Sequence, residues 1–135
     1  MSSPQALFEQ ALALQHSLKR TEAFRLYQEA EAAGLDTADL HTNMGILLHD
    51  QGHVLDAAQR FRRAIAMDPN CFPAINNLGA VCINLGLATE AIACFRYVID
   101  THKKWLDDGV RAIGEELKRL ESEQHVAAQA AVNND

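Results

Sequence analysis

The stretch NMGILLHDQG, Asn43–Gly52, has a close counterpart in NLGAVCINLG, Asn77–Gly86. Each begins with Asn, an apolar residue and Gly, continues through six variable residues, and ends in a second Gly. The two stretches are 34 residues apart at both ends. A fixed offset of this size indicates an internal repeat, and repeats of 20 to 50 residues are typical of stacked helical units.

Further positions keep the same 34-residue step and extend the repeat to three copies. They are three small residues, three alanines, three aromatics and three smaller apolar residues: Ala11, Gly45 and Gly79; Ala23, Ala57 and Ala91; Tyr27, Phe61 and Phe95; Ala30, Ala64 and Val98. The matches by themselves predict an array of three similar units.

Each copy is predicted to contain two helices. In the middle copy, apolar residues recur at helical spacing from Leu40 to Leu48, and again from Val54 to Ile65, with Gly52 between the two segments. Pro69 ends the second segment, because Pro lacks an amide donor and disfavours a helical residue before it. Thr21 and Thr89 are expected to begin the second helices of their copies, since Thr is a favourable N-cap residue.

Gly45 and Gly79 are expected inside helices, where Gly costs about 1 kcal/mol relative to Ala. Such a cost is understandable where a side chain would collide with a neighbour. The bulky neighbour predicted for each is the aromatic of the second helix, Phe61 or Phe95. Both glycines are therefore interpreted as packing residues.

This pattern resembles the tetratricopeptide repeat (TPR) family. The matching residues of the middle copy are His41, Met44, Gly45, Leu48, Gly52, Ala57, Phe61, Ala64 and Pro69, and those of the third are Ile75, Leu78, Gly79, Cys82, Gly86, Ala91, Phe95 and Val98. The first copy matches less well, with Leu7, Ala11, Leu14, Leu18, Ala23, Tyr27 and Ala30. The resemblance implies an all-α fold, a right-handed superhelix of three antiparallel helix hairpins.

The expected domain spans residues 4–122, with repeats at about 4–37, 38–71 and 72–105 and a capping helix at about 105–122. The apolar stripe of that last helix is Leu106, Val110, Ile113, Leu117 and Leu120, while Arg111, Glu115, Lys118 and Arg119 face outward. TPR arrays commonly end in a helix that covers the last apolar face. The tail, 123–135, is Ala-rich and is expected to fray or be disordered.

Composition excludes several classes of function. The chain has 12 basic and 18 acidic residues, a balance opposite to that of proteins that bind nucleic acid through phosphate contacts. No apolar run approaches the roughly 20 residues that span a bilayer, and the N-terminus lacks the pattern of a secretory signal. Cys71, Cys82 and Cys94 form no CxxC pair and are expected to be buried free thiols. A cytoplasmic protein is predicted.

No catalytic, metal or cofactor site is predicted. His49 and His53 have the spacing of a zinc pair, but Gly52 is expected to break the helix between them, and they are interpreted as solvated turn residues. His41 is expected to be partly buried, and Cys82 and Cys94 are expected to be core thiols. No nucleophile with a base, Gly-rich phosphate loop or carboxylate cluster is present, so the chain is predicted not to be an enzyme.

The resemblance implies that the first helix of each copy lines a concave groove. The groove residues expected on this basis are Phe8, Glu9, Leu12, Asp39, Thr42, Asn43, Ile46, His49, Asp50, Asn76, Asn77, Ala80, Ile83, Asn84 and Arg111. Asn43 and Asn77 are the most informative, because an amide both donates and accepts and can grip the backbone of an extended peptide. In the first copy the equivalent residue is Glu9, so the row of asparagines does not continue there.

The carboxylate clamp of co-chaperone TPR domains is not expected here. In the register of the repeats it would need Lys, Asn, Asn, Lys and Arg at Phe8, Leu12, Asn43, Pro73 and Asn77, and only Asn43 matches. The predicted function is a non-enzymatic adaptor or scaffold that binds an extended or helical peptide segment in its groove. Two alternatives stay open: a small secretion or assembly chaperone for one client, and a scaffold that self-assembles into homo-oligomers.

Overall fold

The computed structural model describes residues 2–101 and 108–133, and within these ranges it contains seven helices. Their bounds are α1 Pro4–His16, α2 Arg20–Ala32, α3 Ala38–Asp50, α4 Val54–Met67, α5 Phe72–Asn84, α6 Ala88–Thr101 and α7 Asp108–Asn133. The described residues contain no strand. The all-α prediction is therefore confirmed.

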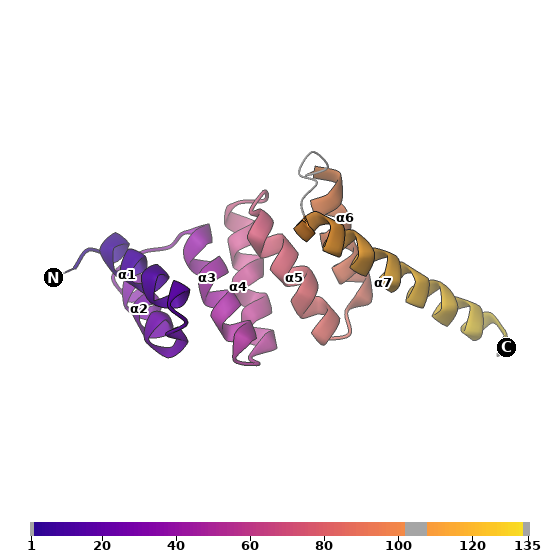
Figure 1. Cartoon of the computed structure of the whole chain (residues 1–135), viewed down its shortest axis with the longest axis horizontal. Helices are drawn as coiled ribbons and strands as arrows, with labels where there is room; N and C mark the ends of the chain where they lie inside the picture. The colour runs from indigo at the N-terminus through magenta and orange to yellow at the C-terminus, as the bar shows by residue number, and fades with distance from the viewer. Residues whose placement is uncertain (1, 102–107, 134–135) are drawn as a thin grey trace. The chain divides into compact units, whose positions relative to one another are not determined.

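The first six helices form three hairpins, α1–α2, α3–α4 and α5–α6 (Figure 1). Each hairpin falls inside one of the three predicted repeat windows. By their contacts the residues group into two compact units, 1–74 and 75–135. The first unit holds the first two hairpins, and the second holds most of α5 together with α6 and α7. The prediction of a single domain over 4–122 stays a prediction.

The turns inside the three hairpins share one backbone conformation. Gly52 and Gly86 have φ values of 85° and 74°, in the left-handed region that Gly adopts without steric cost. In the first hairpin the same position is Leu18, with φ 61°. A side chain at positive φ costs about 1–2 kcal/mol, and Leu18 is 69% exposed, so no burial of the side chain offsets that cost.

Close helix contact explains the glycines in the middle of α3 and α5. A Cβ atom added to Gly45 would lie 2.6 Å from Cε1 of Phe61, and one added to Gly79 would lie 2.6 Å from Cε1 of Phe95. The predicted pairing of glycine with aromatic is confirmed. The first hairpin has Ala11 and Tyr27 instead, both completely buried in one cluster with Leu40, Met44 and Leu47.

The helix starts differ from the prediction. Ser3 and Thr37 cap α1 and α3, with side-chain oxygens that accept from the amides of Ala6 and Leu40. The expected cap Thr21 lies inside α2, whose N-cap is Lys19 and has no side-chain cap hydrogen bond. Thr89 lies inside α6, and its hydroxyl accepts from the amide of Gln124 on α7. In each hairpin the helix begins two positions after the left-handed residue of the turn, which places both threonines too late to cap.

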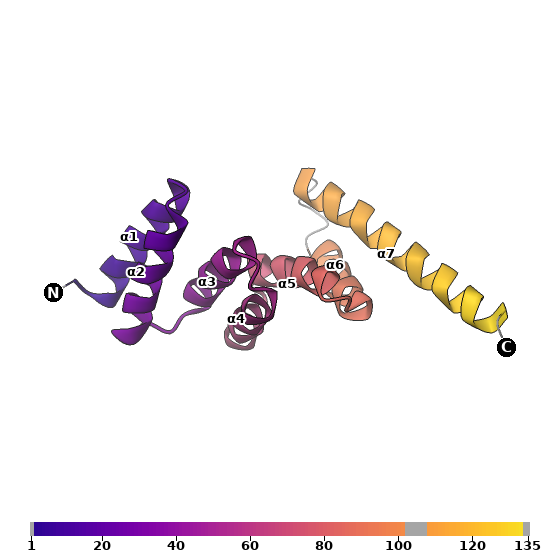
Figure 2. The ribbon, with the colours of Figure 1, turned by 90° about the horizontal axis from the view of Figure 1, so that it is seen from below.

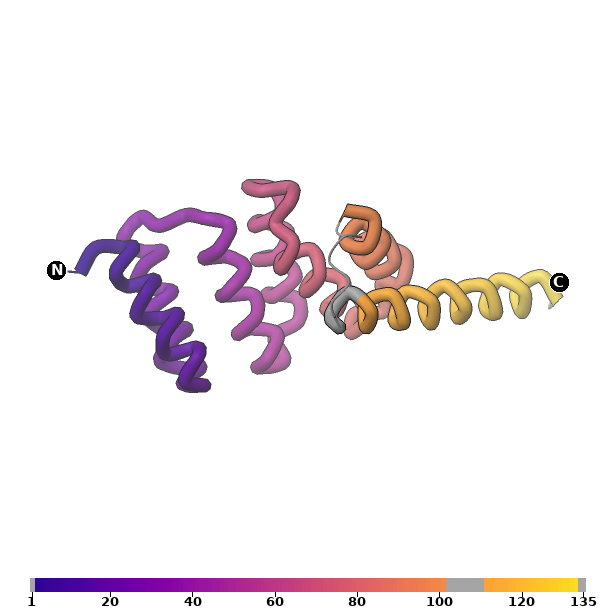
Figure 3. The backbone as a smooth tube through the Cα atoms, turned by 45° about the horizontal axis from the view of Figure 1, so that its top comes forward, coloured from indigo at the N-terminus to yellow at the C-terminus, as the bar shows by residue number. Residues whose placement is uncertain are grey.

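The last helix is longer than predicted. It continues without interruption from Asp108 to Asn133, and its C-terminal half projects beyond α6 in two views (Figures 1 and 2). The expected frayed tail is helical up to Asn133, because Ala, Gln and Glu are strong helix formers and no Gly or Pro interrupts the segment. The tube view follows the same continuous path (Figure 3). Trp105 and Leu106, two predicted residues of this helix, lie outside the described residues.

Candidate interaction surface

The third helix has one face that packing leaves accessible. Leu40, His41, Met44 and Leu47 are fully buried, together with Gly45. The opposite face presents Asp39, Asn43, Ile46 and Asp50, spaced four, three and four residues apart, which places them in one stripe along the helix. Asn43 and Ile46 are half-buried and the two carboxylates are exposed.

The equivalent positions of the other two hairpins are also accessible. The residues 34 positions earlier are Gln5, Glu9, Leu12 and His16 on α1, and those 34 positions later are Pro73, Asn77, Ala80 and Asn84 on α5; all eight are half-buried or exposed. We call each set the open stripe of its helix. Every open stripe therefore carries a polar residue followed three positions later by an apolar one, namely Glu9 with Leu12, Asn43 with Ile46, or Asn77 with Ala80.

The predicted groove residues divide into two groups. All but one are half-buried or exposed: Phe8, Glu9, Leu12, Asp39, Asn43, Ile46, His49, Asp50, Asn76, Asn77, Ala80, Ile83, Asn84 and Arg111. Thr42 is the exception and is 5% exposed. Its hydroxyl donates to the carbonyl oxygen of Ala38 and lies 3.4 Å from the sulfur of Cys71. Thr42 is thus a packing residue of the first unit, which corrects the prediction.

The two asparagines have different surroundings. The side chain of Asn43 makes no hydrogen bond within the described ranges 2–101 and 108–133, whereas Asn77 already has an interaction partner. Phe8 also has a packing role, since its ring centroid lies 5.6 Å from that of Tyr27. Of the predicted surface, the α3 stripe is the part that packing explains least.

The open stripes lie on helices with an uneven distribution of charge. Helices α1, α3 and α5 have 13 residues each and contain no Lys or Arg. Their ionised groups are Glu9, Asp39 and Asp50. Cationic side chains lie instead on the second helices of the hairpins, such as Arg25 on α2 and Arg62 on α4, and on α7. The surface of the first helices is therefore neutral to acidic.

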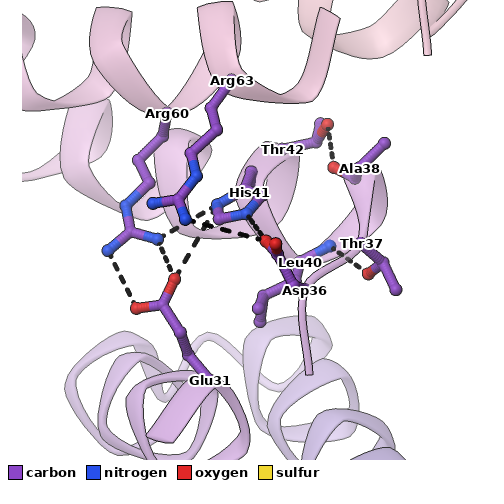
Figure 4. Close-up of polar contacts among 9 residues, drawn as sticks. All are labelled: Glu31, Asp36, Thr37, Ala38, Leu40, His41, Thr42, Arg60 and Arg63. Carbon is purple, nitrogen blue, oxygen red and sulfur yellow. Dashed lines mark hydrogen bonds and ion pairs between the residues drawn. The ribbon is translucent and has the colours of Figure 1, made fainter. Parts of the chain in front are cut away.

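A second polar feature joins the first two hairpins and is drawn in Figure 4. The Arg60 guanidinium on α4 donates to both carboxylate oxygens of Glu31 on α2, at 2.5 and 3.1 Å. It also lies 3.1 Å from Nδ1 of His41, whose Nε2 lies 2.6 Å from a carboxylate oxygen of Asp36. Because arginine only donates, Nδ1 accepts and Nε2 carries the proton toward Asp36. These residues form the Arg60 network.

The Arg60 network contains a polar residue, His41, that is more deeply buried than the sequence predicts. His41 has no exposed surface, and both ring nitrogens have partners. The hydrogen bond from Arg60 holds the pKa of Glu31 below its ordinary value, and the hydrogen bond with His41 does the same for the pKa of Asp36. Both carboxylates are thus held in the ionised form that the network needs.

A comparison between the copies could have revealed the Arg60 network. The positions equivalent to His41 and Arg60 in the third copy are Ile75 and Cys94, two residues that cannot form such an ion pair. Polar residues at repeat positions that are otherwise apolar are the signal. The network is specific to the contact between the first and second hairpins and leaves the open stripe of α3 uncovered.

The residues considered for chemistry lie apart from one another. Cys71 and Cys82 are buried free thiols, as predicted, while Cys94 is only half-buried, which corrects its placement in the core. Helix α3 ends at Asp50, and the Gly52 turn separates His49 from His53. Among the described residues, no group of three or more His, Cys, Asp or Glu side chains could hold a metal ion. No described helix is both long and apolar enough to cross a membrane.

No protein-family model and no curated protein matches the sequence. Several solved structures share its architecture. The TPR domain of Arabidopsis OM64 has a TM-score of 0.77 at 18% identity and covers 87% of this chain and 95% of its own. The first TPR of Spaghetti (RPAP3), bound to the HSP90 peptide SRMEEVD, has 0.79 at 18% and covers 91% and 94%. The Sgt2 TPR domain from Aspergillus fumigatus has 0.78 at 19% and covers 93% and 83%.

These likenesses establish the fold. The chain is built as a TPR domain, with three helix hairpins followed by a further helix. The fold that the family resemblance implies is confirmed.

Proposed function

We propose that this chain is a non-enzymatic protein-interaction module that binds a peptide segment of its partner along the open stripes. The observation that carries the proposal is the accessible stripe of α3, Asp39, Asn43, Ile46 and Asp50, in which Asn43 makes no hydrogen bond within the described residues and Asp50 pairs with Arg20 at 3.5 Å. Its equivalents recur on α1 and α5. TPR domains of the same fold support this class of function, since the RPAP3 domain was solved with a bound peptide.

The chemistry of the stripe defines the kind of peptide. The Asn43 amide can pair with both a backbone N–H and a backbone C=O, while Ile46 offers an apolar contact one turn away. Helices α1, α3 and α5 supply no Lys or Arg as a charge-assisted donor for a carboxylate, and Arg20 of α2, which lies 3.5 Å from Asp50, is already paired with that residue. We therefore expect an extended or helical segment with apolar anchors and a neutral or basic character, in contrast to the acidic EEVD terminus of the peptide bound by RPAP3.

The test is a pull-down with the full chain and its Asn43→Ala, Asn77→Ala double variant. Loss of two backbone-pairing amides should abolish partner capture, while the far-UV circular dichroism stays unchanged because neither side chain is in the buried core. Gln28→Ala with Gln59→Ala is the matched control, because it removes two exposed amides from the second helices of their hairpins. Full capture by the Asn double variant would overturn the proposal.

The partner's charge is tested by competition. A soluble peptide that combines Leu and Lys should displace the captured partner, and its Glu counterpart should not. The displacement should weaken as salt is raised, because salt screens the exposed carboxylates Asp39 and Asp50. Equal competition by the Glu peptide would contradict the expected specificity.

A further inference from the structure

The C-terminal part of α7 is an exposed helical surface. Just before it, the side chain of Gln124 donates a hydrogen bond of 3.1 Å to Thr89 on α6. Residues 125–133, which we call the α7 extension, remain helical and are all exposed. At 1.5 Å per residue the extension is about 13 Å long.

The extension is apolar for an exposed helix. Val126 and Val132 are 63% and 69% exposed, and four alanines lie between them. The extension contains no Asp, Glu, Lys or Arg, and its one titratable side chain is His125. A short helix without packing is marginally stable in water, so these features together point to a surface that another helix covers.

A matching hollow lies beside it on the outer surface of α6. One cavity of about 520 Å³ lies between α6 and α7, with Thr89, Ile92, Ala93 and Arg96 on one side and Glu121, Gln124 and His125 on the other. A second cavity of about 520 Å³ shares Thr89 and Ala93 with the first and continues to Leu87, which is 41% exposed. We call the two together the α6 hollow.

The charges around the α6 hollow are already paired within the chain. Arg96 lies 3.0 Å from Glu121, and Arg119 pairs with Glu116 and Glu123. Arg96 and Glu121 line the hollow and offset each other's charge, Glu90 lines it as well, and its other lining residues are small, apolar or neutral. The extension itself has no Asp, Glu, Lys or Arg, so it can meet this surface without the like-charge repulsion that a contact between copies of a protein with a net charge of −6 must otherwise overcome.

Beyond His125 the extension does not turn back onto the hollow of its own chain, because α7 is one uninterrupted helix that continues past α6 (Figures 1 and 2). A second copy related by a two-fold axis near His125 resolves this. The two α7 helices then run antiparallel, and each extension lies along the hollow of the other copy, as in the self-complementary interfaces of most homodimers.

We propose that two copies of this chain pair through α7, with the extension of each lying in the α6 hollow of the other. The proposal is independent of peptide binding, since it uses none of the open stripes. It predicts a concentration-dependent dimer whose contacts are small-residue and apolar, with Val126 and Val132 on one surface and Leu87 and Ala93 on the other.

Light scattering after size-exclusion chromatography tests the proposal, over about a hundredfold range of concentration, because dimerisation follows mass action. The full chain should shift from monomer to dimer. Ala93→Lys and Val126→Glu should each raise the dissociation constant about tenfold or more, because each buries an unpaired charge. Ala32→Lys and Gln59→Glu make the same charged side chains at exposed positions of the first unit and should leave the dimer unchanged.

A mixture of the two weakened variants gives the sharpest result. A heterodimer would hold one unaltered contact and one in which Lys at 93 meets Glu at 126, so mixing should restore a dimer of one copy of each. Far-UV circular dichroism of each variant separates loss of pairing from loss of fold. The proposal is overturned if the full chain stays monomeric, if either variant pairs like the full chain, or if the mixture stays monomeric.

Discussion

The α3–α4 hairpin and the α6–α7 pair bury their helices in different ways, as two glycines show. Gly45 lies against a fully buried Phe61 ring, at a distance that leaves no room for a methyl group. A Cβ atom added to Gly114 on α7 would have one described atom of another helix within 4 Å, Cδ1 of Ile99 at 4.0 Å. The hairpin interlocks, whereas α7 lies more loosely on its neighbour. The surroundings of a glycine thus show whether its helix takes part in the packing that recurs in the repeats.

The largest effect on stability is expected from adding a side chain where Gly45 lies against Phe61. Gly45→Ala should lower the free energy of unfolding by about 1–3 kcal/mol, because an added methyl overpacks a core that has no space for it. Chemical denaturation measures the change. A second variant that also carries Phe61→Leu should recover part of the loss, and an unchanged midpoint for Gly45→Ala would show that α3 and α4 are not interlocked.

Removing the Arg60 network should have a somewhat smaller effect on the same unit. Arg60→Ala leaves Glu31 and Nδ1 of the buried His41 without a donor, which should cost about 1–2 kcal/mol. Gln59→Ala, at an exposed position next to it, is the control. Equal denaturation midpoints for Arg60→Ala and the control would mean that the network does not hold the first two hairpins together.

At the looser contact between α6 and α7, a substitution is expected to raise the free energy of unfolding instead of lowering it. Gly114→Ala should raise the free energy of unfolding by about 1 kcal/mol, because Ala is favoured over Gly inside a helix and the added methyl meets no close atom. Thermal unfolding followed at the helical signal measures the gain. A loss of stability would indicate that α7 packs as tightly as α3 does.

Leu18 offers a smaller gain at the turn of the first hairpin. Leu18→Gly removes the strain of a side chain at φ 61° but adds backbone freedom to the unfolded chain, so a net gain of about 0.5 kcal/mol is expected. Gly52→Leu in the second hairpin should lose stability for the converse reason. If Leu18→Gly proved destabilising, Leu18 would have a contact that its exposure does not show.

The smallest effect is expected on the free energy of unfolding at acidic pH. The pKa values of Glu31 and Asp36 are lower in the folded chain than their ordinary values of 4.5 and 3.8. Their contribution is therefore fully present above those values and is lost as the pH falls through the lower folded values. Glu31→Gln should flatten this part of the stability profile below about pH 4.5. A profile of unchanged slope would contradict the contribution of the Glu31 ion pair.

The sequence predicts the parts of this protein that recur. Gly45 with Phe61 and Gly79 with Phe95 follow from one step of 34 residues, because identical packing needs identical residue types at equivalent positions. The Arg60 network and the burial of Thr42 could not be predicted in this way, because each occurs in one copy only. His41 looked like a bulky residue at a packing position, and its partners Glu31 and Arg60 lie on other helices. Thr42 lies one residue from the open stripe, and its exposure of 5% and its contact with Cys71 show that it is buried.

The length of α7 escaped prediction for a different reason. Alanine-rich segments such as 126–131 are strong helix formers but have no clear apolar stripe, so local preference and pattern disagree. The predicted end near residue 122 reflects the apolar pattern, whereas the observed helix follows the local preference. The α6 hollow depends on side chains from two helices and had no signal in the sequence.

The proposed partner binds along the open stripe of α3 and leaves the second helices of the hairpins uncovered. A photo-crosslinking amino acid placed at Ile46 in the full chain, and separately at exposed Gln59 on α4, tests this binding mode most directly in extract from the cells that make the protein. The account predicts a discrete crosslinked protein from position 46 and none from position 59. The same product from position 59, or none from position 46, would contradict it.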